Sequence, residues 1–370
     1  MQRYLLIIAA LMILGLDSCS KVEAGNEKKT NSIYFTAEDA SVAKDPALNT
    51  INLNSFYVSS VQENGTAYFK DLNVFTKDGG NSWESDYVYA WPEGSLEFYA
   101  YSNANGQISV DASGMQFAGF TVPEDIDEQK DFVVAYNKGS AEDFAAQGVH
   151  LLFKHATSSV SIKAVNDSDI YIVKVYGIKI ANLRGSDTFT FVHNSLTEHC
   201  WSKWFNSAYD PTSTTYVCKY LYNEPVVLDK NASSVSDGAN IYLIPQCMGK
   251  WKATSAETNT LENRGAYISL LVNITTVDGT SVYPSRKDYY TNGVNAAWDA
   301  VGVEVEWLPG RHYEYTLNFL HNGSGAGQKD PDEPEIPGSG GDVILGGLIT
   351  LNLGIEEWLP GGDTEIILDK

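Results

Sequence analysis

The most constraining feature of this sequence is the stretch LLFKHATSSVSIKAV at residues 151–165. It begins with an apolar run, and then every second residue from Val160 to Ala164 is apolar, while Ser161 and Lys163 between them are polar. Alternation with a period of two is typical of a strand that buries one face. The stretch therefore predicts a place where two β-structures meet, with about one domain's worth of chain on each side.

Turn signals recur at short intervals before this stretch and favour an all-β fold. Asn-Gly and Asp-Gly pairs beginning at Asn64, Asp78 and Asn105 separate short segments that have the composition of strands. The chain has 370 residues, of which 43% are hydrophobic and 12% aromatic, so it has enough apolar residues to bury two cores. We therefore predict two tandem β-sandwich domains, an N-terminal one over residues 33–150 and a C-terminal one over residues 151–321.

The N-terminus has the form of a lipoprotein signal peptide over residues 1–18. Arg3 precedes an apolar run that is short for a membrane span, and the run ends in Leu-Asp-Ser followed by Cys19. Cleavage before Cys19 and acylation of its thiol would hold the protein on the outer membrane through lipid. An ordinary secretory signal with an incidental cysteine is the alternative. Residues 19–32 are polar and predict a tether.

Beyond residue 321 the character of the chain changes twice. Residues 322–341 are rich in Gly, Ser, Pro and acidic residues, which predicts a linker that is semi-rigid at its prolines. The C-terminal segment, residues 342–370, contains a new alternation of apolar residues, made by Ile349, Leu351, Leu353 and Ile355. This strand would extend about 23 Å. Its apolar face must be buried against a β-sandwich, either that of its own subunit or that of a neighbour.

Two motifs of the sequence resemble the fimbrillin family, the lipoprotein-derived type V pilus subunits of Bacteroides-type bacteria. One is L-x-F-x-H-x-x-S-x-V-x-I, from Leu151 to Ile162, and the other is a Pro-Gly turn followed by Tyr-x-Tyr-x-Leu, from Pro309 to Leu317. The resemblance implies transthyretin-like sandwiches and a surface-exposed structural protein of the fimbrium. It also implies assembly with other pilin subunits by β-strand exchange: a protease removes the N-terminal strand, and a C-terminal strand of another subunit fills the vacated groove.

The sequence departs from the best-known members of that family at the processing site. Those proteins are cut after an arginine ahead of the first domain, whereas here no arginine lies between Arg3 and Arg184. The remaining candidates, for a protease of different specificity, are Lys28, Lys29 and Lys44. The sequence leaves open whether the protein is a stalk subunit, a lipid-bound anchor or a simple surface lipoprotein.

Motifs for catalytic chemistry are absent from the sequence. It has no G-x-S-x-G, H-E-x-x-H, Walker-type or EF-hand motif, and the spacing of His193, His199, Cys200 and Cys218 fits no familiar zinc site. We therefore expect no enzyme activity, no cofactor and no metal. The formal net charge of −22 argues against nucleic acid as a partner.

The loop between Cys200 and Cys218 is rich in aromatic residues and gives the alternative function. Outside the cytoplasm these two cysteines could form a disulfide. Aromatic side chains on a surface loop commonly stack on sugar rings. The candidate glycan contacts are Trp201, Trp204 and Tyr209. The alternative is thus a surface lipoprotein that binds host or bacterial glycans, unless these rings are buried, in which case they belong to the core.

Overall fold

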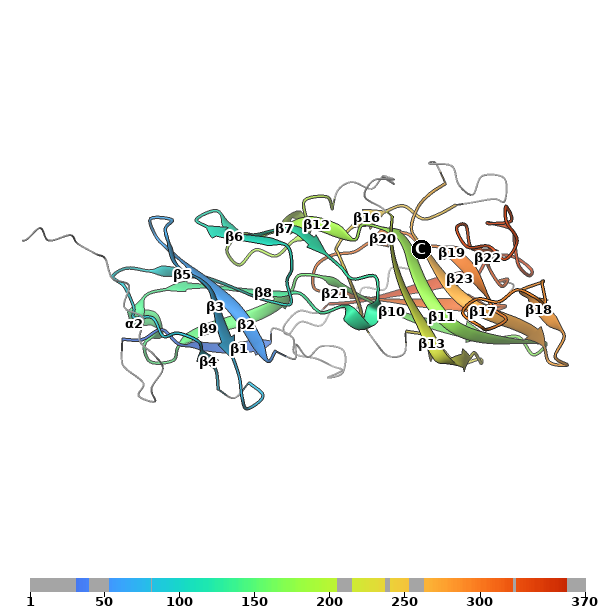
Figure 1. The fold of residues 1–370 in the computed structure, drawn as a ribbon, viewed down its shortest axis with the longest axis horizontal. Helices are drawn as coiled ribbons and strands as arrows, with labels where there is room; N and C mark the ends of the chain where they lie inside the picture. Colours follow the sequence, from blue (N-terminus) through green and yellow to red (C-terminus); the bar gives the residue numbers. More distant parts are fainter. Residues whose placement is uncertain are drawn as a thin grey trace, which may run out of the picture.

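The computed structural model describes residues 31–39, 53–80, 82–204, 215–236, 240–252, 263–321 and 324–357. These residues are mostly in β-strands, as the sequence predicts, and their helices are the short η1 (Ile126–Glu128), α2 (Ala141–Phe144) and η2 (Glu198–Cys200). The molecule is elongated, with the early strands at one end and the late strands at the other (Figure 1).

A seven-stranded sheet forms the N-terminal end. Its strands, in order across the sheet, are β1 (Phe35–Asp39), β9 (Val149–His155), β8 (Val133–Gly139), β5 (Leu96–Ser102), β2 (Ser55–Gln62), β3 (Ala67–Phe75) and β4 (Glu84–Ser85). One face of the sheet buries aromatic and aliphatic side chains, among them Phe56, Phe98 and Phe153. β1 lies at the edge and pairs with β9 in parallel.

The other face of this sheet packs against a small three-stranded sheet. That sheet consists of β12 (Ser186–Phe191), β7 (Gly114–Thr121) and β6 (Gln107–Asp111). The ring of Phe117 in β7 lies 4.9 Å from that of Tyr101 in β5 and 5.2 Å from that of Phe132, measured between centroids. Because β12 comes from the chain beyond residue 165, both halves of the sequence contribute to one continuous core.

Two larger sheets form a sandwich at the C-terminal end. The first contains β14 (Ser233–Ser234), β10 (Ser158–Asn166), β21 (Arg311–Phe319) and β23 (Thr350–Glu357), with β15 (Ile241–Leu243) also paired to β10. The second contains β13 (Tyr216–Val227), β11 (Tyr171–Leu183), β17 (Tyr267–Thr276), β19 (Ala297–Gly302) and β22 (Gln328–Lys329), with β18 (Ser281–Tyr283) paired to β17. A further pair joins β16 (Cys247–Met248) to β20 (Val305–Glu306). Ile162 and Leu317 of the first sheet share a core with Ile180 and Leu270 of the second.

The stretch at residues 151–165 is divided between two sheets. Its first part belongs to β9 of the N-terminal sheet, and its alternating part belongs to β10, where Val160 and Ala164 are buried and Ser161 is partly exposed. The predicted alternation is therefore confirmed. β10 pairs in parallel with β21, with Ser159 opposite His312. The sequence does not predict this pairing, because a parallel partner so distant along the chain leaves no local pattern.

The prediction of a linker over residues 322–341 is wrong for the described part of that segment, residues 324–341. β22 pairs with β19, and the side chains of Asp330 and Glu335 are buried. Lys179 Nζ lies 2.8 Å from a carboxylate oxygen of Asp330, and Ser285 donates hydrogen bonds to Glu335 from both its backbone N–H and its hydroxyl. A composition of glycine, proline and acidic residues is typical of flexible chain, but here distant residues hold the carboxylates in place.

Candidate strand-pairing interface

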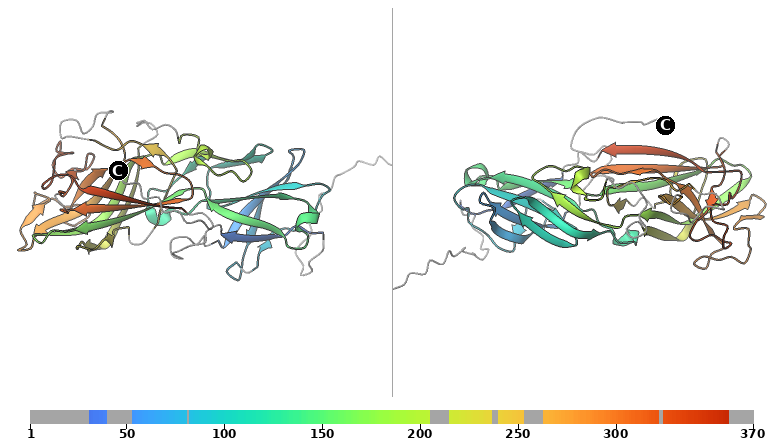
Figure 2. Two further views of the ribbon diagram at one scale, coloured as in Figure 1. Left: turned by 180° about the vertical axis from the view of Figure 1, so that it is seen from behind. Right: turned by 90° about the horizontal axis from the view of Figure 1, so that it is seen from above.

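β23 lies at the edge of its sheet and at the surface of the molecule (Figure 2). It pairs antiparallel with β21, from Arg311 opposite Glu357 to Asn318 opposite Thr350. The first of these pairs is also an ion pair, with 2.8 Å between nitrogen and oxygen. Within the described chain, the outer edge of β23 pairs with no other strand. An edge of this kind presents backbone N–H and C=O groups that another strand can pair with.

The apolar residues predicted for this strand are only partly covered by their own sheet. Ile349, which precedes β23, is buried, whereas Leu353 is 43% exposed. Leu351 and Ile355 are half-buried and pack against the main core. Leu353 lies opposite Tyr315, a buried residue of β21. The apolar face of β23 therefore points to the core side of the sheet but retains surface that deeper burial would remove from water.

A buried polar cluster on β21 joins the supporting strand to β10. Nδ1 of His312 lies 3.0 Å from the hydroxyl of Ser159, and Nε2 lies 2.9 Å from the hydroxyl of Ser161. Burial lowers the pKa of His312 to about 4, so the ring is neutral at neutral pH. A neutral imidazole donates from one nitrogen and accepts at the other, and hydroxyl groups can satisfy both. This cluster fixes the strand on which β23 lies.

β1 also lies at a sheet edge and shows the same alternation as β23. Ile33, just before it, and Phe35 within it are buried. The ring of Phe35 packs edge-on against that of Phe98, with 5.9 Å between centroids. Loss of β1 would uncover both the edge of β9 and this part of the core. The sequence predicts ordered structure from residue 33, and β1, which begins at Phe35, is the N-terminal strand in the described chain.

Five of the predicted site residues lie outside the described residues: Cys19, Lys28, Lys29, Lys44 and Tyr209. Lipidation and processing therefore stay predictions. The position of β1 nevertheless separates the candidate lysines. Lys44 follows β1 in the sequence, so cleavage there would detach the strand, whereas Lys28 and Lys29 precede it, so cleavage at either would leave it attached to the domain.

Trp201 is a core residue, which corrects the prediction that it contacts a glycan. Its side chain is 1% exposed, and its indole N–H donates a hydrogen bond of 2.9 Å to the carbonyl of Ala156. The ring packs against Phe189 with 4.9 Å between centroids. Trp204 is half-buried, and its indole N–H donates to the carbonyl of Trp307 at 2.8 Å. Trp201 therefore has no ring face open to a sugar.

The described cysteines, Cys200, Cys218 and Cys247, are free thiols, so the disulfide considered for the first two is not formed in this structure. Burial raises the pKa of Cys218 to about 12. The described residues contain no cluster of three or more His, Cys, Asp or Glu side chains that could hold a metal ion. None of the described helices is long and apolar enough to cross a membrane.

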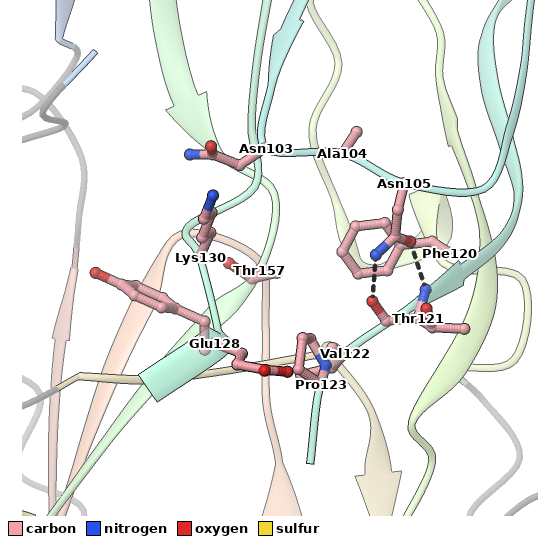
Figure 3. A pocket seen from close by; sticks show the side chains of 11 residues that line it. Asn103, Ala104, Asn105, Phe120, Thr121, Val122, Pro123, Glu128, Lys130 and Thr157 are labelled. Atoms are coloured by element: carbon pink, nitrogen blue, oxygen red, sulfur yellow. Dashed lines mark hydrogen bonds between the residues drawn. The ribbon is translucent and has the colours of Figure 1, made fainter. Parts of the chain in front are cut away.

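An open cavity of about 280 Å³ is lined by residues from both ends of the molecule (Figure 3). Its lining includes Asn105 and Thr121 from the N-terminal end, Thr157 between β9 and β10, and Tyr242 of β15. The side chain of Asn105 is engaged by the backbone of Thr121 through two hydrogen bonds of 2.8 Å (Figure 3). These polar groups hold the loop in place, and we assign the cavity no chemistry.

Comparisons with known proteins give a family match and similar solved structures. A sequence profile described as fimbrillin-like matches residues 47–329. Among solved structures, the chain is similar in fold to a fimbrial protein from Bacteroides vulgatus, with 13% identity, a TM-score of 0.51, and coverage of 89% of this chain and 99% of that one. A fimbrial assembly protein from Parabacteroides distasonis has 9% identity and a TM-score of 0.40, covering 88% and 95% of the two chains. No curated protein sequence matches. Since the profile spans most of the sequence, the chain belongs to the fimbrillin-like family.

Proposed function

We propose that this chain is a subunit of a surface pilus, assembled by exchange of β-strands between copies or related subunits. Membership of the fimbrillin-like family makes it a structural protein rather than an enzyme. The observation that carries the strand-exchange proposal is β23, an edge strand whose apolar face is only partly covered by its own sheet.

β1 marks the acceptor groove in this proposal. Apolar residues alternate from Ile33 to Ala37 and also from Leu351 to Ile355, so a neighbour's β23 could present the same pattern to the edge of β9 after β1 is removed. The backbone hydrogen bonds that β23 loses from β21 are replaced in the new ladder. Complete burial of Leu353, now 43% exposed, would contribute about 1 kcal/mol.

The processing site in this proposal is Lys44, because it is the candidate lysine that follows β1. A stalk subunit would be exported as a lipoprotein acylated on Cys19 and then released from its lipid by this cleavage. A subunit that keeps its N-terminal segment would remain on the outer membrane as an anchor. N-terminal sequencing of the protein from cell surfaces distinguishes the two, since a stalk subunit begins just after Lys44 and an anchor begins at acylated Cys19.

The strand-exchange proposal is tested by single substitutions in β23. Leu353→Asp places a charge on the apolar face and should abolish filaments, while the secreted monomer keeps its circular dichroism spectrum because the residue is already 43% exposed. Asn352→Asp places the same carboxylate at an exposed neighbouring position on the other face and is the matched control. Normal filaments from a chain that lacks residues 349–370 would refute strand exchange through this segment.

A further inference from the structure

Lys179 and Asp330 are buried together at the second sheet of the C-terminal sandwich. The described part of residues 322–341 packs at the same place. Lys179 is in β11, near the middle of the sheet, and Asp330 directly follows β22 at its edge. Their side chains are 1% and 0% exposed. Lys179 Nζ lies 2.8 Å from Oδ2 of Asp330.

The contact between these two groups differs from an ordinary hydrogen-bonded ion pair. Within the described part of the chain, Oδ2 of Asp330 accepts no hydrogen bond, although the amine nitrogen is 2.8 Å away. The geometry therefore brings the nitrogen close to the carboxyl group without aligning an N–H with its oxygen. Nζ instead donates a hydrogen bond of 2.9 Å to Oε1 of Glu333, which is partly exposed.

The second oxygen of the Asp330 carboxyl group lies in an arrangement that stabilises negative charge. Oδ1 accepts hydrogen bonds from the backbone N–H groups of Asp332 and Glu333, both at 2.9 Å. Two backbone N–H groups aimed at one carboxyl oxygen have the form of an oxyanion hole, which stabilises the tetrahedral intermediate of acyl transfer. The amine nucleophile, the acyl carbon and the oxyanion donors are therefore within one small site.

Aromatic rings flank the buried lysine of this site, whereas Glu333 lies at its exposed rim. Nζ of Lys179 lies 4.8 Å from the ring centroid of Trp298 and 5.7 Å from that of Tyr267, and both rings are buried. An apolar environment has a low dielectric constant and so strengthens the effect of nearby hydrogen-bond donors on a developing negative charge. It also removes the bulk water that would compete with amide formation.

We propose that Lys179 and Asp330 are the site of a self-catalysed covalent cross-link, an amide bond between Nζ and the carboxyl carbon Cγ. Glu333, which accepts a hydrogen bond from Nζ, carries one proton from the ammonium group to Oδ2, leaving a neutral amine beside a carboxylic acid. The nitrogen lone pair attacks Cγ, and the C=O electrons move onto Oδ1, where the two backbone N–H groups hold the negative charge.

Glu333 completes the reaction as its acid–base group. It takes a second proton from Nζ and delivers it to the Oδ2 hydroxyl, which leaves as water with the electrons of the Cγ–Oδ2 bond while the C=O bond of Oδ1 re-forms. One Nζ–Cγ bond is made, one Cγ–Oδ2 bond is broken, and one hydrogen remains on the amide nitrogen. The reaction needs no oxidant, reductant or cofactor.

The cross-link would join the middle of the second sheet to the chain just ahead of the segment that leads to β23. Tension applied through β23 would then reach a covalent bond at Asp330 before it could peel β22 from β19. This inference does not rest on strand exchange, because the bond forms within one subunit whether or not subunits assemble.

Peptide mapping of the full folded chain by mass spectrometry tests the proposal. The expected result is a branched peptide that contains Lys179 and Asp330 and is lighter by one water than the sum of its two arms. Lys179→Arg keeps the positive charge but should give no branched peptide. Glu333→Gln keeps the side-chain size at a partly exposed position, and general acid–base catalysis of this kind contributes about 100-fold or more, so freshly purified Glu333→Gln protein should be mainly unlinked.

Two other lysine–carboxylate pairs are internal controls in the same digest. Lys163 and Glu314 are 2.7 Å apart but partly exposed and should not be linked. Water loss that maps to Lys329 and Glu335, which are 3.2 Å apart, would overturn the assignment to Lys179. Wild-type protein with a native circular dichroism spectrum and no branched peptide would overturn the proposal as a whole, and a fully linked Glu333→Gln protein would overturn the role of Glu333.

Discussion

Replacement of Trp201 by alanine should strongly destabilise the fold rather than remove a binding function. The indole ring is 1% exposed and is in contact with Phe120, Phe132 and Phe189, with centroid distances of 5.3, 6.3 and 4.9 Å. Truncation of a large buried aromatic residue to alanine costs about 3–5 kcal/mol. It also removes the hydrogen bond to the carbonyl of Ala156, which joins β9 to β10.

The size of this effect decides how the experiment is designed. Folded proteins of ordinary stability have unfolding free energies of roughly 5–15 kcal/mol, so Trp201→Ala could leave too little folded protein to measure. Trp201→Phe keeps most of the ring and loses chiefly the hydrogen bond. Because the Ala156 carbonyl is buried, we expect this milder variant to cost about 1–3 kcal/mol.

Urea unfolding followed by near-ultraviolet circular dichroism compares the variants. Tyr290→Ala is the matched aromatic control, since this ring is 62% exposed and its loss should change the unfolding free energy by less than about 0.5 kcal/mol. An unchanged unfolding midpoint for Trp201→Ala, together with loss of binding on a glycan array, would refute the core assignment and restore the glycan-contact prediction.

Three further outcomes are expected from single groups. Burial lowers the pKa of His312 from 6.5 to about 4, so its neutral form should add about 3 kcal/mol to the unfolding free energy above pH 6.5, and this contribution should be lost as the pH falls to about 4. Urea unfolding across this range should show an unfolding free energy that rises with pH, and His312→Gln should flatten this dependence on pH. In the native protein, iodoacetamide should modify Cys247, which is partly exposed, well before buried Cys218, whose pKa is raised to about 12, as mass spectrometry of the alkylated peptides can check. Gly114→Ala should cost about 1–3 kcal/mol in urea unfolding, because its φ is +125° and a Cβ there would lie 2.5 Å from the carbonyl oxygen of Phe191.

The strands were predictable where their side chains follow a local pattern. The alternation from Val160 to Ala164 predicted the buried face of β10, and that of Leu351 to Ile355 predicted β23. Both patterns are visible because each strand has two different faces. The partners of these strands were not predictable, since β10 pairs with β21 and β1 pairs with β9 across long sequence separations that local alternation does not encode.

The burial of the described part of the 322–341 segment depends on a signal that lies elsewhere in the sequence. Residues around Asp330 have the composition of exposed chain, and nothing local indicates that this carboxylate is buried. The signal was Lys179, one of two lysines in the mostly apolar strand β11, because a buried ammonium group requires a partner of opposite charge. The acidic segment supplies that partner. The prediction of a linker is wrong because this contact joins residues far apart in the sequence, and local composition does not indicate it.

The placement of the two edge strands bears on what would trigger assembly. β23 is already paired with β21 in its own subunit, so a β23 that moves to a neighbour exchanges one ladder for another with little net gain in backbone hydrogen bonds. β1 is also paired, and Phe35 fills part of the core of the N-terminal sheet. Exchange between intact subunits therefore has little driving force. Under the strand-exchange proposal, detachment of β1 would uncover the edge of β9 and an apolar surface that a neighbour's strand then covers, so proteolysis after Lys44 would create the driving force. Mixing of uncut subunits should accordingly yield monomers. Addition of a protease that cuts after Lys44 to the same mixture should yield filaments.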